Sequence, residues 1–164
     1  RTIGIQNGRF SVCAFQDLER AAGSFDLVYA LGVVHHLAGA AGRAAFFGAA
    51  FRWLSPGGML YIREPSARGL PRRVAYRFFR NRCGIHSPNE EHLDPVGTMS
   101  EVAAAGFDAP RLEYTDVIGG PLPWLLQTRS PVVWSAAFAF DRAWLAVPGL
   151  RRLASQFSVT ARRR

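Results

Sequence analysis

Residues 25–34 read FDLVYALGVV and residues 54–62 read LSPGGMLYI, and these two stretches decide the fold of the chain. The first is an apolar run with a single charged residue, Asp26, and such a run is typical of a strand buried on both faces of a parallel sheet. The second passes through a Pro-Gly-Gly turn into the apolar strand Met59–Ile62. Between them, apolar residues recur at helical spacing, at Ala40, Ala44, Phe47, Phe51 and Leu54.

A helix that connects two strands in this way forms a βαβ unit, whose strands are parallel and whose crossover is right-handed. A second helix is expected to begin at Asp94-Pro95, because Asp is a favourable N-cap and Pro fits the first helical position. Gly106 ends that helix. Further strands are expected at residues 9–15, 111–118 and 157–161. We therefore expect an α/β fold: a partial Rossmann-like, doubly wound sheet, mostly parallel, with an antiparallel last strand.

The composition fits a single domain that spans residues 1–164, because 49% of the residues are hydrophobic and this length can bury a core. Residues 66–92 are expected to form a lid-like segment. Residues 119–150 hold three of the four Trp residues and are expected to form an insertion before the last strand. The two cysteines, Cys13 and Cys83, are too few for a disulfide scaffold and predict free thiols in a cytoplasmic protein.

Three segments, in this order and spacing, resemble the region from the fourth to the fifth strand of class I S-adenosylmethionine-dependent methyltransferases. They are Gly23–Val28 (GSFDLV), Gly32–Leu37 (GVVHHL) and Leu54–Leu60 (LSPGGML). Glu64-Pro65 and Ala105–Phe107 also fit, so the resemblance covers nearly the whole chain. The chain is most similar to the C-terminal part of the small-molecule and quinone-type group.

The resemblance implies S-adenosylmethionine as the cofactor, bound beyond the carboxyl ends of the strands, where open α/β sheets bind their ligands. The residues expected to contact it are Ala14, Phe15, Gln16, Ala30, Leu31 and Gly32. Two of these have an alternative interpretation. Phe15 packs either on the adenine ring or in the core, and Gly32 either admits the ligand or eases the turn after the strand.

The resemblance also implies which parts of the cofactor site are missing from the sequence. The first strand, the glycine-rich loop and the acidic residue that holds the cofactor ribose are expected to lie before Arg1. The position that corresponds to the family's adenine-contacting acid holds Ala14. We therefore expect this chain alone to bind the cofactor weakly.

His35, His36 and Glu64 are the candidate catalytic residues. Methyl transfer depends mainly on orienting the acceptor, and a base is needed only where the acceptor must lose a proton. Imidazole titrates near neutrality, so the His pair is a candidate base or acceptor-positioning element. The alternative is that one His caps the following helix and the other packs against the core. Glu64 either orients the acceptor or pairs with an Arg.

Cys83, His86, Glu91 and His92 have a spacing that resembles a metal site, but a structural zinc usually needs four ligands and paired Cys motifs. We expect no metal here. The segment is better explained as a loop over the acceptor pocket.

The net charge is +8 and all 20 basic residues are Arg. The densest stretch, Arg72–Arg82, is predicted to be a helix with an apolar and a basic side. It is either a surface helix or a lid over an anionic or lipid-like acceptor, and a peripheral membrane contact through this helix and the Trp-rich segment is a further expectation. Specific nucleic-acid binding is not expected, because the Arg residues are otherwise scattered. The oligomeric state is open.

The sequence predicts methyl transfer from S-adenosylmethionine to a small acceptor, hydrophobic if the aromatic segment contacts it. The alternative is a non-catalytic remnant or interaction domain of the same fold. A nucleic-acid methyltransferase is suggested only by the charge. Residues 30–33 (ALGV) lack the Asn- or Asp-Pro-Pro-aromatic sequence of base methyltransferases, which argues against it.

Overall fold

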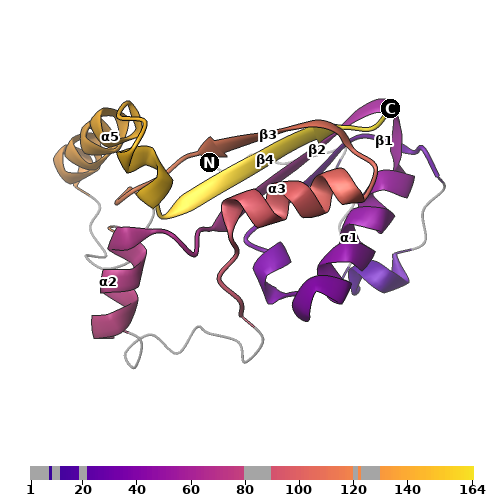
Figure 1. Ribbon diagram of the computed structural model, residues 1–164, viewed down its shortest axis with the longest axis horizontal. Coiled ribbons are helices and arrows are strands. Elements are labelled where there is room, and N and C mark those ends of the chain that lie inside the picture. The colour runs from indigo at the N-terminus through magenta and orange to yellow at the C-terminus, as the bar shows by residue number, and fades with distance from the viewer. Residues whose placement is uncertain (1–7, 9–11, 19–21, 80–89, 120–121, 123–129) are drawn as a thin grey trace.

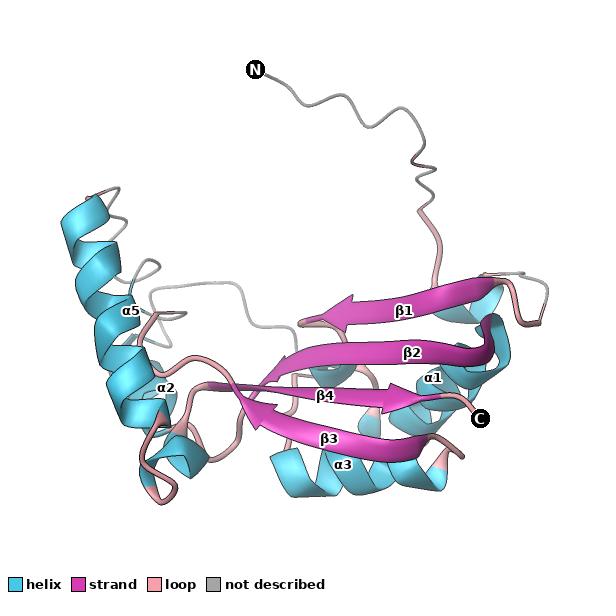
Figure 2. Ribbon diagram, turned by 90° about the horizontal axis from the view of Figure 1, so that it is seen from above, coloured by secondary structure: helices cyan, strands magenta, loops and turns pink. Residues whose placement is uncertain are grey.

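The structure, a computed structural model, describes residues 8, 12–18, 22–79, 90–119, 122 and 130–164. Its strands form one sheet, and helices α1 (Gly39–Trp53) and α3 (Pro95–Ala104) cover one face of that sheet (Figure 1). Figure 2 looks onto the sheet, with both helices behind it. Helices α2 (Leu70–Phe79) and α5 (Pro131–Leu145) lie together at one end of the molecule.

Within the described residues, the sheet has four strands in the order β1-β2-β4-β3. They are β1 (Phe25–Leu31), β2 (Leu54–Pro65), β3 (Asp108–Tyr114) and β4 (Gln156–Arg162). β1 and β2 pair in parallel, and β4 is antiparallel to both β2 and β3. The predicted α/β fold, with its parallel βαβ unit and its antiparallel last strand, is therefore confirmed.

Strand β1 is shorter than the predicted range 25–34, because the chain turns sharply after Leu31. Gly32 has a φ of +64°, a conformation that side chains other than Gly rarely adopt. The short 3-10 helix η2 (Val34–His36) follows immediately. The turn therefore lifts His35 and His36 out of the strand and places them at the carboxyl edge of the sheet.

Strand β2 is longer than predicted, because the Pro-Gly-Gly turn is itself paired into the sheet. Phe25 aligns with Leu54, and the register then shifts before Leu27 aligns with Met59. Gly57 N–H donates to the carbonyl of Arg163 (2.8 Å), and Arg163 N–H donates to the carbonyl of Gly58 (2.9 Å). The Pro-Gly-Gly segment, which the sequence predicts to be a turn before the strand, therefore forms the amino end of β2.

Helix α3 begins as the sequence predicts: the Asp94 side chain accepts a hydrogen bond from Gly97 N–H (2.9 Å), and Pro95 opens the helix. Helix α1 contributes Phe46, Phe47, Ala49 and Ala50 to the buried residues. Phe46, Phe47 and Ala50 pack with the apolar side chains on the covered face of the sheet, which are Ala30, Leu60, Ile62, Phe157, Val159 and Ala161.

Two predicted strands differ from the structure. Residues 12–14 have no regular structure and Phe15–Asp17 form a short 3-10 helix, η1, so the predicted strand 9–15 is wrong where the structure describes it; residues 9–11 lie outside the described residues. Strand β3 overlaps the predicted range 111–118, but it begins three residues earlier and ends four residues earlier. Isolated runs of strand-forming residues predict strands less reliably than the βαβ pattern does, because such a run forms a strand only where it pairs and packs in a sheet.

The other face of the sheet is uncovered by the described residues. Leu27, Tyr29 and Leu31 of β1 alternate onto this face and are about half exposed or more, with Tyr29 at 66%. Met59 of β2 lies beside Leu27 on the same face and is also exposed. β1 is an edge strand as well. Both features are unusual for the buried, parallel part of a doubly wound sheet.

Residues 66–79 lead from β2 into α2, and α5 followed by the 3-10 helix η4 (Leu150–Leu153) precedes β4. The lid-like segment 66–92 and the insertion 119–150 stay predictions as functional units; residues 80–89, 120–121 and 123–129 lie outside the described residues. Among the helices described, none has the length and apolar character needed to cross a membrane.

Candidate active site

The candidate site lies at the carboxyl edge of β1 and β2, where the chain leaves both strands of the parallel pair. Leu31 aligns with Arg63 at this edge, and Gly32 N–H donates to the carbonyl of Arg63 (2.9 Å). Glu64 is the next residue of β2. Since neighbouring residues of a strand point to opposite faces, Arg63 lies on the uncovered face and Glu64 on the covered face.

Glu64 is completely buried and its carboxylate holds the turn after β1. Oε1 accepts hydrogen bonds from the backbone N–H groups of Val33 (3.0 Å) and Val34 (2.9 Å). Oε2 lies 2.7 Å from Nδ1 of His35. A buried carboxylate needs such partners, because without them its desolvation is very costly. Glu64 is therefore a link between the end of β2 and the turn, and it is not open to an acceptor in this structure.

The two histidines have different environments. His35 is 7% exposed and its Nδ1 carries the proton, because a carboxylate oxygen only accepts. His36 is exposed, and its ring lies 3.9 Å from the His35 ring, centroid to centroid, at 39°. Glu64 thus fixes His35, and His35 supports the ring of His36.

Residues 90–93 cover His35 from the other side. Glu91 N–H donates to the carbonyl of His35 (2.8 Å), and Arg43 of α1 holds the Glu91 carboxylate at 2.6 Å. Glu90 Oε1 lies 3.9 Å from Nε2 of His35 and 3.0 Å from an Arg72 nitrogen. His35 is therefore enclosed between two carboxylates, of which only Glu64 is within hydrogen-bond distance.

Three predicted cofactor contacts lie at this edge, two in the last residues of β1 and one directly after it. Ala30 is buried against the core, Leu31 points to the uncovered face and is exposed, and Gly32 makes the turn. A Cβ built on Gly32 would meet nothing nearer than Cε1 of His35, at 3.7 Å. The positive φ therefore explains why Gly stands here, and the expected approach of a ligand to this turn stays a prediction.

The other three predicted cofactor contacts lie in and before η1. Ala14 and Gln16 are exposed, and Phe15 is partly buried. The Phe15 ring meets Phe46 of α1 edge-on at 5.5 Å and packs against the core. This geometry favours the core interpretation of Phe15, and contact with the cofactor remains a prediction for all three residues.

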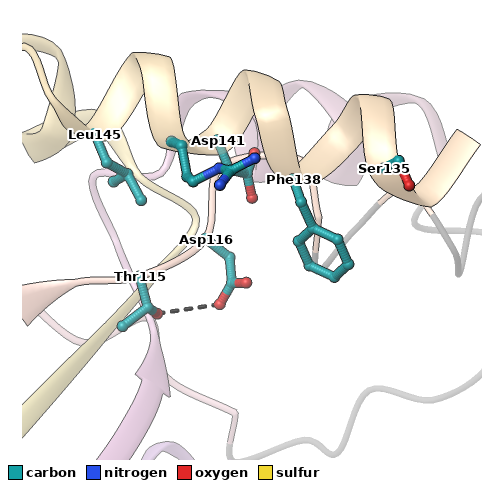
Figure 3. Close-up of a pocket in the computed structure, with 7 residues that line it drawn as sticks. Thr115, Asp116, Ser135, Phe138, Asp141 and Leu145 are labelled. Atoms are coloured by element: carbon teal, nitrogen blue, oxygen red, sulfur yellow. Dashed lines mark hydrogen bonds between the residues drawn. The ribbon is translucent and has the colours of Figure 1, made fainter.

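An open pocket of about 480 Å³ lies between α5 and the segment after β3 (Figure 3). Asp116 pairs with Arg63 of β2 and accepts a hydrogen bond from the Thr115 hydroxyl (3.1 Å). Because Arg63 precedes Glu64, this ion pair connects the pocket to the same edge of the sheet. The lining residues are Thr115, Asp116, Ser135, Phe138, Asp141, Arg142 and Leu145.

Asp141 anchors α5 beside this pocket. Its carboxylate is buried and accepts the backbone N–H groups of Val117 (3.1 Å), Ile118 (2.9 Å) and Gly119 (3.0 Å). Sequence analysis did not identify Asp141, Asp116 or Glu90 as structural links. For Asp141 the sequence offers one signal, because it is a single acid within an apolar helical stretch. Such an acid, if buried, needs hydrogen-bond donors from another segment.

Among the residues that the structure describes, no group of three or more His, Cys, Asp or Glu side chains is arranged to hold a metal ion. Two residues of the metal-like spacing, Cys83 and His86, lie outside the described residues. Cys13 is exposed and forms no disulfide.

Comparisons with known proteins agree with this geometry. Residues 3–62, which include β1, α1 and most of β2, match the family described as methyltransferase domain. No curated protein matches the chain. The fold is similar to that of many solved structures; the three described next are 12% to 19% identical to this chain, so their similarity shows the fold alone.

Three of these structures indicate the range of the fold. One is the Haemonchus contortus phosphoethanolamine N-methyltransferase 2 in complex with S-adenosyl-L-methionine (TM-score 0.55, 15% identity, 92% of this chain and 36% of that one). The second is a methyltransferase from Thermotoga maritima, named as a possible histamine N-methyltransferase (0.60, 12%, 93% and 62%). The third is the [4+2]-cyclase SpnF (0.54, 19%, 94% and 55%).

The chain thus spans between 36% and 62% of the length of these three proteins. The matched residues include the turn that carries His35 and His36. Residues 3–62 thus match the methyltransferase-domain family, and the described part of the chain has the fold of the solved methyltransferases compared above.

Proposed function

We propose that the protein carrying this chain transfers a methyl group from S-adenosylmethionine to a small acceptor, and that His36 contacts that acceptor. The observation that carries the proposal is the arrangement of Glu64, His35 and His36 at the carboxyl edge of the parallel strands. Ligands of open α/β sheets bind at this edge. An exposed imidazole held on a buried and hydrogen-bonded one is suited to orienting an acceptor.

The residues present fit one side of the cofactor. Gly32 itself has no side chain at the turn, where the nearest neighbour of a built Cβ would be the His35 ring, and Leu31 offers an exposed apolar surface beside it. Ala30, Leu31 and Gly32 would line the cofactor on the β1 side, mainly through the backbone. The cofactor supplies the electrophilic methyl group, and the contribution of this chain is to place the acceptor and keep water from it.

Each residue of the trio has a different role in the proposal. Glu64 and His35 are positioning residues, since both are buried and Glu64 ties the ring to the turn. His36 is the residue proposed to touch the acceptor, as an acceptor-orienting group or as the base that removes its proton. Near neutral pH an imidazole is suited to either role.

A small molecule is the acceptor class that the geometry favours. The pocket beneath α5 has the volume of a small-molecule site, combines Phe138 and Leu145 with two hydroxyl groups, and is linked to the candidate site by the Arg63–Asp116 pair. The Haemonchus enzyme is named for phosphoethanolamine and the Thermotoga protein for histamine, both small molecules.

The test is transfer of radiolabel from methyl-labelled S-adenosylmethionine by the full-length protein, over a panel of small amines, phenols and hydroquinones. Replacing His36 with Gln should slow turnover by roughly a hundredfold if the ring acts as a base, while cofactor affinity and melting temperature change little. Replacing exposed Arg111 with Gln, on β3, is the control. Normal turnover after the His36 change would remove the assigned role.

A second candidate is an interaction domain without catalytic activity. It is favoured by the exposed apolar residues Leu27, Tyr29 and Leu31 on an edge strand, which are suited to pairing with further protein. Binding of S-adenosylmethionine by the full-length protein distinguishes the two candidates, because an interaction domain has no need of the cofactor.

A further inference from the structure

Helix α5 is apolar on nearly all of its exposed surface. Of its 15 residues only Ala137 and Asp141 are buried. Val132 is 75% exposed, and Phe138 and Phe140 are about half exposed. The exposed polar residues of the helix are Ser135 and Arg142. A soluble helix normally shows a polar face opposite its buried seam, so this helix lacks the surface that water would favour.

The exposed charged residues of α5 and η4 themselves all have one sign. Arg142 is exposed on α5, and Arg151 and Arg152 are exposed on η4, next to the exposed Val147 and Leu150. Asp141 is the one acidic residue between 131 and 153, and its carboxylate is used by three backbone N–H groups. No exposed acidic side chain therefore offsets the Arg residues of this segment.

Helix α2 adds the same combination at the same end of the molecule (Figures 1 and 2). Leu70 and Val74 are exposed, and so are Arg73 and Arg77. The helix has no acidic residue. We call the exposed side chains of α2, α5 and η4 the helical end; its members are Leu70, Arg73, Val74, Arg77, Val132, Phe138, Phe140, Arg142, Val147, Leu150, Arg151 and Arg152.

Aromatic residues give the helical end an amphipathic character. Trp134 stacks on Phe138 (5.7 Å between ring centroids), and Trp144 lies 5.5 Å from Phe140. The indole N–H of Trp144 donates to the carbonyl of Leu150 (2.7 Å), so the ring is fixed with its polar group satisfied. Indole rings of this kind favour the boundary between lipid and water.

We propose that the helical end docks the protein on the surface of an anionic lipid bilayer, with α5 lying in the interface and its Arg neighbours on the lipid phosphates. Apolar side chains next to cations, with no exposed anions between 131 and 153 or on α2, match the requirements for peripheral binding to acidic lipid. An acidic protein partner would match the Arg residues but not the nearly continuous apolar surface of α5. The proposal is independent of the methyl acceptor, and it concerns a surface contact, since α5 has 15 residues and a membrane span needs about 20.

The test is flotation of the full-length protein with vesicles of phosphatidylcholine alone and with equal parts of phosphatidylcholine and phosphatidylglycerol. Binding to the anionic vesicles, weakened by added salt, is expected, with little binding to the neutral ones. Changing Arg151 and Arg152 together to Gln should weaken that binding about thirtyfold. Changing Phe140 to Ser should weaken it about tenfold by removing the apolar contact.

The matched control changes Arg52 and Arg162 together to Gln, because both are exposed at the opposite end of the sheet from the helical end. This pair removes the same charge and should leave vesicle binding near the original value. Equal binding by the two double variants would overturn the proposal, because net charge alone would then explain it. The proposal would also be overturned if the original protein did not bind anionic vesicles. It would be overturned as well if the Phe140→Ser variant kept its vesicle binding but lost self-association in light scattering, because the apolar surface would then contact a second copy of the protein.

Discussion

Glu64 holds more of the candidate site in place than any other described side chain there. Changing it to Gln replaces one acceptor oxygen with an amide nitrogen, so a backbone N–H of the turn or Nδ1 of His35 loses its partner in a buried place. We expect the free energy of unfolding to fall by about 2 kcal/mol, measured by urea denaturation. Changing exposed Glu113 to Gln should have almost no effect, and equal losses for both variants would contradict the positioning role.

Asp94 is the second residue whose role can be tested alone, and it links stability to pH. Burial raises the pKa of Asp94, but the hydrogen bonds from Gly97 N–H and Arg68 outweigh it and hold the pKa below its ordinary value. The ionised carboxylate therefore stabilises the fold above the pKa of the unfolded chain, near 4, and this contribution is lost as the pH falls through the lower pKa of the folded chain.

Replacing Asp94 with Ala should lower the free energy of unfolding by about 1 kcal/mol at neutral pH, since the cap of α3 is lost. Asn keeps an acceptor for Gly97 N–H, so the free energy of unfolding of the Asn variant should lie between those of the original protein and the Ala variant. The advantage of Asp over Asn should shrink when urea unfolding is repeated near pH 3. A gap between them that is the same at both pH values would show that the charge of Asp94 contributes nothing.

Local chemistry explains which residues could be predicted. The cap Asp94-Pro95 involves neighbours in sequence, so its role follows from residue type and position alone. His35, His36 and Glu64 were identified as candidates because they end strands. Their division into a buried pair and an exposed ring depends on contacts between residues about 30 positions apart, which no local pattern encodes.

At the scale of elements, Asp141 decides how α5 is attached to the sheet. Changing it to Ala leaves three backbone N–H groups of the segment 117–119 without their acceptor. We expect the amides of this segment to exchange with deuterium much faster, and the free energy of unfolding to fall by about 3 kcal/mol. Changing exposed Ser135 to Ala, on the same helix, is the control, and unchanged exchange at 117–119 would show that other contacts hold α5.

The βαβ unit was predictable, because an apolar strand-forming run, apolar residues at helical spacing, a glycine turn and a second apolar run follow one another without interruption. The segment around residues 9–15 was not, although it contains strand-forming residues. Its one described contact with the core is made by Phe15. Strand propensity expresses how well a residue fits a sheet surface, and where no neighbouring strand is present that preference has no effect.

In the whole molecule, the two faces of the sheet differ within the described residues. Only the face under α1 and α3 is covered by described residues, and the exposed residues of β1 lie on the other face. Of the predicted cofactor contacts on β1, the described residues offer the turn at Gly32 and the exposed Leu31. Calorimetric titration of the 164-residue chain with S-adenosylmethionine should therefore show weak binding, and micromolar affinity would contradict this expectation.

Hydrogen–deuterium exchange of the full-length protein, with and without S-adenosylhomocysteine, tests whether the carboxyl edge of β1 and β2 is the proposed site of methyl transfer, because it locates the ligand without knowledge of the acceptor. We expect slower exchange at the amides of Ala30–His36 when the ligand is bound, with little change in α3. Unchanged exchange at Ala30–His36, under conditions in which calorimetry shows the ligand to be bound, would rule out this edge as the cofactor site.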